Sequence, residues 1–301
     1  MSYILISLWP LFVLILAGYG MRRFGFPGEG FWPGAERFNY YILFPALLFN
    51  SLSVAPLAHP ALPRLLAAVM ILLFVATTGL VAARWLWKWP ASRFGVLVQG
   101  ILRFNTYLGL AAVSGLYGKE GLLFAAVILA VVVPTVNVLS VLALSADNTK
   151  SVRALLIPVA KNPLIMACAA GAAVNFAGIE FKWGSEKLLT LLANTSLPLG
   201  LLSVGAALKL DELRGQVGTL VGNSVGRLLL MPALALLIAG ALGLPAIETA
   251  ILILFFALPT APTAYIFARQ LGGDSHLMAG LITFQTMLSA ISLPLVMAVA
   301  A

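Results

Sequence analysis

Long apolar runs, separated by short breaks rich in charge, glycine or proline, are the feature that most constrains this chain. The hydrocarbon core of a bilayer is about 30 Å thick, and a helix needs about 20 apolar residues to cross it. Runs of this length lie at roughly residues 3–21, 36–54, 62–84, 94–117, 121–145, 155–178, 187–208, 215–242, 246–270 and 275–299. The sequence therefore predicts an all-α integral membrane protein with ten transmembrane helices.

The composition excludes a water-soluble protein. Hydrophobic residues make up 61% of the chain and charged residues only 9%, whereas a soluble domain has about 25% charged residues. A net charge of +8 would suggest nucleic acid as the partner of a soluble protein. Here the basic residues lie mostly between the apolar runs, so we expect a lipid bilayer as partner and no nucleic acid.

The chemistry of a metal site, a cofactor site or an enzyme is not evident. Cys168 is the single cysteine, and the two histidines, His59 and His276, lie in or beside expected loops. There is no phosphate-binding loop and no pair of aspartates for lipid phosphate chemistry. We expect no cofactor, no metal and no catalytic residue.

The basic residues also predict the orientation of the chain. Cytoplasmic loops of membrane proteins carry an excess of Lys and Arg. The loops after odd-numbered runs, with their flanks, hold 12 of the 18 basic residues, and the opposite side holds 4. The expected product is a multi-pass protein of the cytoplasmic (inner) membrane with both termini outside the cytoplasm.

The two halves of the chain resemble each other at a nearly fixed offset. Residues of the same type recur 153 positions apart at Pro10 and Pro163, Gly18 and Gly171, and Pro45 and Pro198. Each half contains five runs, so the second half would enter the membrane from the opposite side. We expect two inverted five-helix repeats, residues 1–145 and 155–301, joined by a short cytoplasmic connector at 146–154. This architecture is typical of secondary transporters, whose sites lie at the repeat interface.

The fourth and ninth runs are expected to break near the middle of the membrane and to cross there. Pro259 and Pro262 interrupt the ninth run, and each proline removes a backbone donor and clashes with the preceding turn. The fourth run has no proline but carries Arg103, Asn105 and Thr106 at the equivalent depth. The N-termini of half-helices attract anions and their C-termini attract cations. Backbone amides near Thr260 to Thr263 are expected to be free for a ligand or solvent.

The candidate site residues follow from these breaks. The expected substrate-binding residues are Arg103, Asn105, Thr106, Tyr107, Pro259, Thr260, Pro262, Thr263 and Asn50. Three further residues are candidates for ion binding or hydrogen-bond support, namely Asn137, Asn194 and Gln285.

Several roles stay open at this point. Arg103 either meets an anion or pairs with backbone carbonyls, and Arg227 is either a second anion contact or a buried structural cation. The acidic residues all lie in loops or near the ends of runs, which argues against a proton relay through Asp or Glu. Neutral oxygens of Asn50, Asn137 or Gln285 are candidates for a sodium site. A coupling sodium ion or proton and a homodimer are left as alternatives.

Several short segments carry a resemblance that covers essentially the whole chain. They are Phe44-Pro45-Ala46-Leu47-Leu48-Phe49, Arg103-Phe104-Asn105-Thr106-Tyr107-Leu108-Gly109, Lys161-Asn162-Pro163-Leu164, Leu197-Pro198-Leu199-Gly200-Leu201, Val204-Gly205-Ala206-Ala207-Leu208, Leu258-Pro259-Thr260-Ala261 and Arg269-Gln270-Leu271-Gly272-Gly273-Asp274. Together and in this order they resemble the auxin efflux carrier family of permeases, which is related in fold to bile-acid sodium symporters.

The resemblance implies two inverted repeats, crossing helices 4 and 9, and a scaffold-like and a panel-like bundle that move against each other. It also implies export or exchange of small organic anions, from indole-type acids in plant relatives to malate- or malonate-like dicarboxylates in bacterial ones. The sequence departs from the plant pattern because Ala111 stands in the region of the crossover proline. The expected function is a secondary active or facilitative transporter of a mono- or dicarboxylate by alternating access. The alternative is a channel or a non-transporting membrane scaffold.

Overall fold

A computed structural model describes residues 2–28, 30–54, 60, 62–146, 162–179, 184–214 and 216–300, and these residues form helices and turns with no strand. The first half contains α1 (Ser2–Arg23), α2 (Phe31–Phe38), η1 (Asn39–Leu43), α3 (Phe44–Ser53), α4 (Leu62–Trp87), α5 (Ala91–Leu102) and α6 (Thr106–Leu144). The second half contains α8 (Pro163–Phe176), α9 (Ser185–Ala206), η2 (Leu210–Arg214), α10 (Val217–Val225), η3 (Gly226–Leu230), α11 (Met231–Leu242), α12 (Ala246–Ala257), α13 (Thr263–Gln270) and α14 (Ser275–Ala300). The expected connector at 146–154 lies outside the described residues, except for residue 146.

The all-helical, multi-pass character predicted from the sequence is confirmed. Among the described residues, six helical segments are long and apolar enough to cross a membrane, namely 2–23, 62–87, 91–144, 185–206, 217–242 and 275–300. The 91–144 segment is divided by a sharp bend within α6, where Gly118 has φ +58° and non-helical ψ. Glycine adopts this backbone conformation without the steric cost that a Cβ atom imposes.

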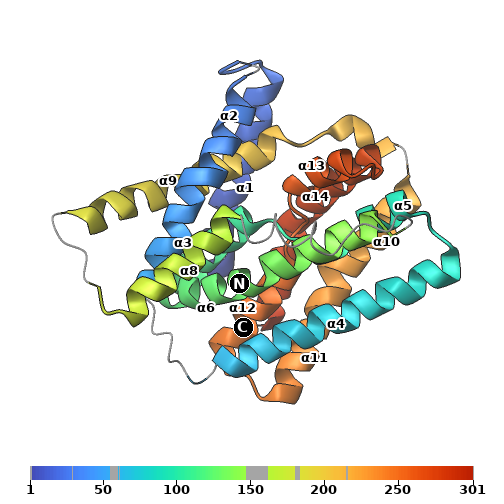
Figure 1. Ribbon diagram of the computed structural model, residues 1–301. Helices are drawn as coiled ribbons and strands as arrows, with labels where there is room; N and C mark the ends of the chain where they lie inside the picture. Colours follow the sequence, from blue (N-terminus) through green and yellow to red (C-terminus); the bar gives the residue numbers. More distant parts are fainter. Residues whose placement is uncertain are drawn as a thin grey trace.

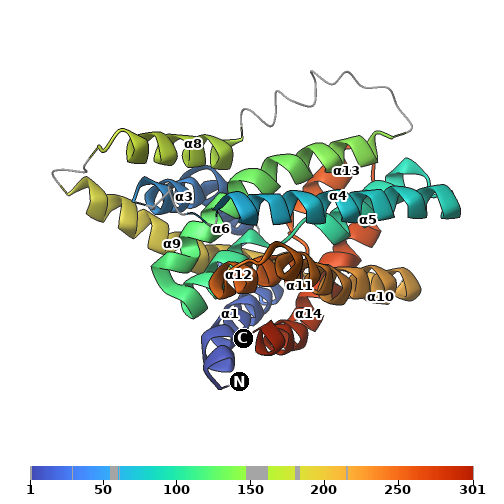
Figure 2. The ribbon, with the colours of Figure 1, turned by 90° about the horizontal axis from the view of Figure 1, so that it is seen from below.

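The helices form two bundles (Figures 1 and 2). The first bundle consists of α1, α2 with η1 and α3, α8, and α9, which pack mainly on one another. The second bundle consists of α4, α5, α6 and the helices from α10 to α14. In both views α3, α8 and α9 lie together at one end of the molecule and α4, α5 and α10 at the other.

Glycines bring the helices of the first bundle into backbone contact. A Cβ atom on Gly18 of α1 would overlap the carbonyl of Leu202 in α9, and one on Gly205 of α9 would overlap the carbonyl of Ile15 in α1. In the same way, a Cβ on Gly171 of α8 would lie 2.7 Å from the carbonyl oxygen of Phe49 in α3. Small residues permit such close helix packing in membranes, where dispersion contacts are a main source of association energy.

Two widened helical turns shape the helices that line the site. η1 joins α2 to α3 and η3 joins α10 to α11, and both have the π-helical hydrogen-bond pattern. Pro45 follows η1 and Pro232 follows η3 within two residues. A proline cannot donate to the carbonyl one turn before it, so the helix widens there. The wide turn at η3 carries Arg227, which is fully buried.

Candidate functional site

Two short non-helical segments meet at the centre of the second bundle. α5 ends at Leu102 and α6 begins at Thr106, and Arg103 and Asn105 between them have extended backbone conformations. Residues 258–262 separate α12 from α13 in the same way. The backbone N–H of Asn105 donates to the carbonyl of Pro259 at 2.8 Å, so the two segments touch.

Asn105 explains how a helix begins here without a proline. Its side-chain Oδ1 accepts a hydrogen bond of 3.1 Å from the backbone N–H of Leu108. This is the contact of a helix N-cap, and asparagine is among the residues that favour that position. Asn105 is 1% exposed. The residue thus starts α6 deep inside the protein.

Arg227 satisfies the ends of both interrupted helices. Its Nε donates to Leu258 O at 2.6 Å, its Nη2 to Phe255 O at 2.8 Å and its Nη1 to Ile101 O at 2.8 Å. The last carbonyls of a helix have no partner within it and carry partial negative charge. One guanidinium therefore caps the C-terminal ends of α5 and α12 together. Of the two roles left open for Arg227, the structure favours that of a buried structural cation.

Gln285 and Thr260 add a second set of bonds behind the crossing. Gln285 of α14 accepts a hydrogen bond from the amide of Thr260 at 2.9 Å and donates to Gly100 O at 3.2 Å. The Thr260 hydroxyl donates to Gln99 O at 3.1 Å. The expectation of a free amide at Thr260 was wrong, because the Gln285 side chain occupies it.

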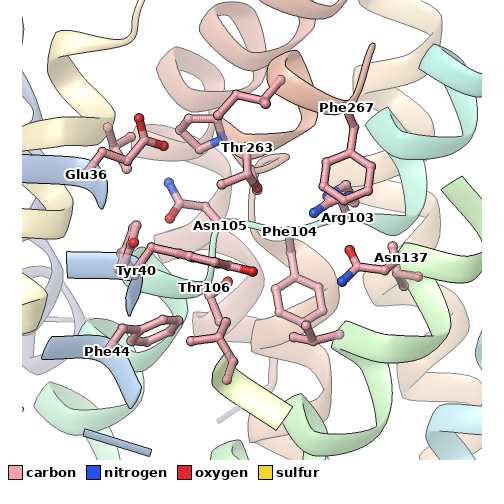
Figure 3. Close-up of a pocket in the computed structure, with 18 of the residues that line it drawn as sticks. Glu36, Tyr40, Phe44, Arg103, Phe104, Asn105, Thr106, Asn137, Thr263 and Phe267 are labelled. Carbon is pink, nitrogen blue, oxygen red and sulfur yellow. The ribbon is translucent and has the colours of Figure 1, made fainter. Parts of the chain in front are cut away.

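A cavity of about 520 Å³ lies on the other side of the crossing, between the two bundles (Figure 3). Seven of the residues predicted from the sequence line it: Arg103, Asn105, Thr106, Tyr107, Asn137, Pro262 and Thr263. The first bundle contributes residues of α2, η1 and α9, among them Glu36, Tyr40 and Ser203. Hydrophobic side chains such as Phe44 and Phe104 complete the lining.

Five of the predicted site residues lie elsewhere. Pro259 and Thr260 belong to the crossing but do not line the cavity, and Gln285 lies behind it. Asn50 is partly buried in α3, and Asn194 is exposed on α9. The structure thus brings the 103–107 and 262–263 residues together with Asn137, and it separates Asn50 and Asn194 from them.

Three polar groups of the cavity wall lack hydrogen-bond partners within the described part of the chain. They are Nη1 of Arg103, Nδ2 of Asn105 and Oγ of Ser203, and all three atoms are buried. The Arg103 guanidinium lies over the ring of Phe267, 4.2 Å from its centroid. A cation–π contact of this kind holds the guanidinium in place and leaves its N–H groups free to donate. The first two groups only donate and the Ser203 hydroxyl can donate, which suits an acceptor-rich ligand.

Three helix N-termini face the same cavity. Asn105 caps α6, Pro262 precedes α13, and Asn162 caps α8 by accepting from the Leu164 amide at 2.9 Å. Residues of all three N-terminal turns line the cavity. Each N-terminus carries partial positive charge, so the three together favour an anion.

Several residues of the site were not predicted from the sequence. Glu36, Tyr40, Asn162 and Phe267 all line the cavity. Glu36 is the first residue of the expected apolar run 36–54, so the sequence placed it at a helix end. In the structure α2 begins at Phe31, and Glu36 therefore lies more than one turn inside a helix. The signal that identifies it is the 8-residue amphipathic helix before Asn39, which the search for apolar runs passes over.

The fold and cavity define a multi-pass helical membrane protein with an internal chamber whose walls are mostly apolar and carry a few hydrogen-bond donors. Residues 140–297 match the family described as "Membrane transport protein". The chain belongs to this family of transporters, the auxin efflux carrier family whose motifs it carries, and it is not an enzyme.

Two archaeal proteins are similar over nearly the full length. An uncharacterized transporter from Methanothermobacter thermautotrophicus is 26% identical, and the match covers 94% of each chain. An uncharacterized transporter from Methanocaldococcus jannaschii is 23% identical, again over 94% of each chain. Both relatives are thus described as transporters, and each match extends over nearly the whole chain.

Proposed function

We propose that the protein transports a small organic carboxylate across the cytoplasmic membrane by alternating access. The observation that carries the proposal is the convergence of Arg103, Asn105 and three helix N-termini on one cavity. A carboxylate would accept from the free N–H groups of Arg103 and from Nδ2 of Asn105. Charge-assisted hydrogen bonds of this kind are about twice as strong as neutral ones.

We propose further that residues 1–145 and 155–301 are inverted repeats. Two correspondences support this. α5 and α12 each have 12 residues and each is followed by a non-helical segment. The glycine contact of α1 with α9 has a counterpart in the contact of α8 with α3, and Gly18 and Gly171 are 153 residues apart. Helices 4 and 9 of such a transporter would be α5–α6 and α12–α13, crossing near the midplane.

The position of the cavity suits a mechanism in which one bundle moves against the other. Its lining comes from α2, η1, α8 and α9 of the first bundle and from the crossing, α6 and α13 of the second. Relative motion of the bundles would therefore expose the cavity alternately to the two sides. Arg37, on the cavity wall, belongs to the basic residues assigned to the cytoplasm, so we interpret this conformation as inward-facing.

Coupling ion and assembly remain part of the proposal. Of the neutral oxygens considered for sodium, that of Gln285 already accepts from Thr260, whereas Asn137 lines the cavity. Asn137 is therefore the sodium candidate to test first, with a coupling proton or a facilitative mechanism as the other outcomes. In a homodimer, either the first bundles or the second bundles of the two protomers would pack against each other within the lipid.

The proposed topology is tested by cysteine labelling after Cys168→Ala. Cysteine at Ser2 or at Ala301 should react with an impermeant thiol reagent applied to intact cells. Cysteine at Asn148 should react only after the membrane is made permeable. Labelling of the Asn148 position from outside would reverse the orientation and both predicted terminal positions.

Transport is tested with purified protein in liposomes. A carrier should give saturable uptake of an organic acid, identified by thermal-shift screening, and trans-stimulation when the same acid is preloaded inside. A linear, non-saturating flux would favour the alternative of a channel. The absence of flux for every acid that binds would favour a non-transporting scaffold.

A further inference from the structure

Glu36 is the charged group of the cavity that the proposed carboxylate site does not use. It lies on α2 and is partly buried, and its side chain lines the same cavity as Arg103. Figure 3 shows Glu36 on one side of Asn105 and Arg103 on the other. The cavity thus has one negatively charged and one positively charged side chain at separate places on its wall.

No described residue neutralises either of these charges. In the described part of the chain Glu36 makes no hydrogen bond or ion pair, and Nη1 of Arg103 has no partner. Arg37, the third charged residue of the lining, is exposed to solvent and belongs to the following position of α2. A partly buried carboxylate without a nearby cation carries a desolvation penalty. A ligand that places a cationic group beside Glu36 would offset this penalty and bind more tightly.

We infer that the ligand is zwitterionic, with its carboxylate at Arg103 and Asn105 and an ammonium group at Glu36. The inference rests on the proposed transport of a carboxylate and narrows its substrate class. A dicarboxylate would place its second negative charge against Glu36, and like charges brought together in a site of low dielectric constant repel each other. A simple monocarboxylate would leave Glu36 desolvated and unpaired. An ω-amino acid satisfies both ends of the cavity.

The hydrogen-bonding groups between the two charges fit this arrangement. Tyr40 and Thr263, whose hydroxyl groups both donate and accept, line the cavity near Asn105. The methylene chain of an amino acid would lie against apolar neighbours such as Phe44 and Phe104, which are both buried. Apolar walls with a few placed polar groups are the usual form of a small-molecule site.

The test uses ligands that differ only at the end remote from the carboxylate. For each chain of three to six carbons, thermal shifts and uptake are measured for the ω-amino acid, the monocarboxylate and the dicarboxylate. The wild-type protein should bind at least one ω-amino acid with an affinity about tenfold higher, or more, than that of the matched monocarboxylate. We expect a ratio of this size from one additional charged contact. The dicarboxylate should bind more weakly still.

A pair of isosteric variants assigns the preference to Glu36. Glu36→Gln keeps the shape of the side chain and should reduce the ratio between amino acid and monocarboxylate to near one. Glu186→Gln makes the same chemical change in the first turn of α9, at an exposed position outside the cavity, and should keep the wild-type ratio.

The other possible outcomes overturn either the zwitterion inference or the proposed transport function. Wild-type protein that binds monocarboxylates or dicarboxylates as tightly as the amino acids overturns the zwitterion inference and leaves the proposed carboxylate transport intact. A ratio that survives Glu36→Gln also overturns the inference, because another group must then recognise the amine. Failure of all carboxylates, with or without an amine, to bind folded protein would instead overturn the proposed function itself.

Discussion

The two sides of the helix crossing contain one arginine each, Arg227 fully buried and Arg103 partly buried, and the two residues are used differently. On the side of the helix C-termini, Arg227 donates three hydrogen bonds to carbonyls of both interrupted helices. On the side of the N-termini, Arg103 stacks on Phe267 and leaves Nη1 without a partner. The role of a membrane arginine therefore depends on whether its N–H groups have acceptors within the protein, and burial alone does not indicate it.

The largest effect of a substitution is expected at Arg227. Arg227→Met keeps much of the side-chain volume but leaves three carbonyls at the ends of α5 and α12 without their donor. Each buried acceptor left without its donor costs about 1–3 kcal/mol. We expect little folded protein by size-exclusion chromatography in detergent. Arg227→Lys should rescue poorly, since one ammonium lacks the planar fork that reaches all three carbonyls. Normal melting of the methionine variant would contradict the structural role.

Arg103 should respond in the opposite way. Arg103→Ala removes a donor that has no protein partner, so the melting temperature without ligand should stay close to the wild-type value. The stabilisation by a bound carboxylate should disappear, and Arg103→Lys should restore part of it because charge returns without the fork. Thermal-shift titration measures both effects. Wild-type ligand stabilisation of the alanine variant would make Arg103 structural as well.

Asn105 separates capping from binding within one side chain. Its Oδ1 caps α6, while its Nδ2 is free. Asn105→Asp keeps an N-cap acceptor but replaces the free donor with a negative charge, so carboxylate affinity should fall about tenfold or more. Asn105→Ser also keeps the cap but adds no charge, and its loss should be smaller. Equal affinities for the two variants would show that Nδ2 does not meet the ligand.

The smallest effect is expected at Phe267. Phe267→Leu removes the ring over Arg103 but keeps an apolar side chain. A cation–π contact contributes about 1 kcal/mol, so the affinity should fall about fivefold. Phe267→Tyr keeps the ring and serves as the control. An unchanged affinity for the leucine variant would mean that packing elsewhere orients Arg103.

The fold class and half of the site were predictable from the sequence because both have local signals. Apolar runs mark the membrane helices, and Asn105 and Pro262 mark helix starts at places where a span should continue. The role of Arg227 was not predictable, because its three acceptors lie 28 to 126 residues away along the chain. Glu36 was misplaced because its short helix is amphipathic and adds no apolar run of its own. Residues whose role depends on distant partners require the folded structure.

The glycine contacts of the first bundle have a mechanical consequence. Where Gly18 and Gly205 let the backbones of α1 and α9 touch, a shift of one residue along either helix would push a Cβ atom into a carbonyl. The Asn39 side chain donates from Nδ2 to the backbone carbonyl of Ser196 at 3.0 Å and accepts at Oδ1 from the Ser196 hydroxyl at 2.8 Å, which holds η1 against α9. These contacts fix the register of the helices, so in the proposed mechanism the first bundle would move as one body. The boundary that contains the cavity would then be the plane along which the bundles slide, and a ligand in the cavity would lie between the moving parts.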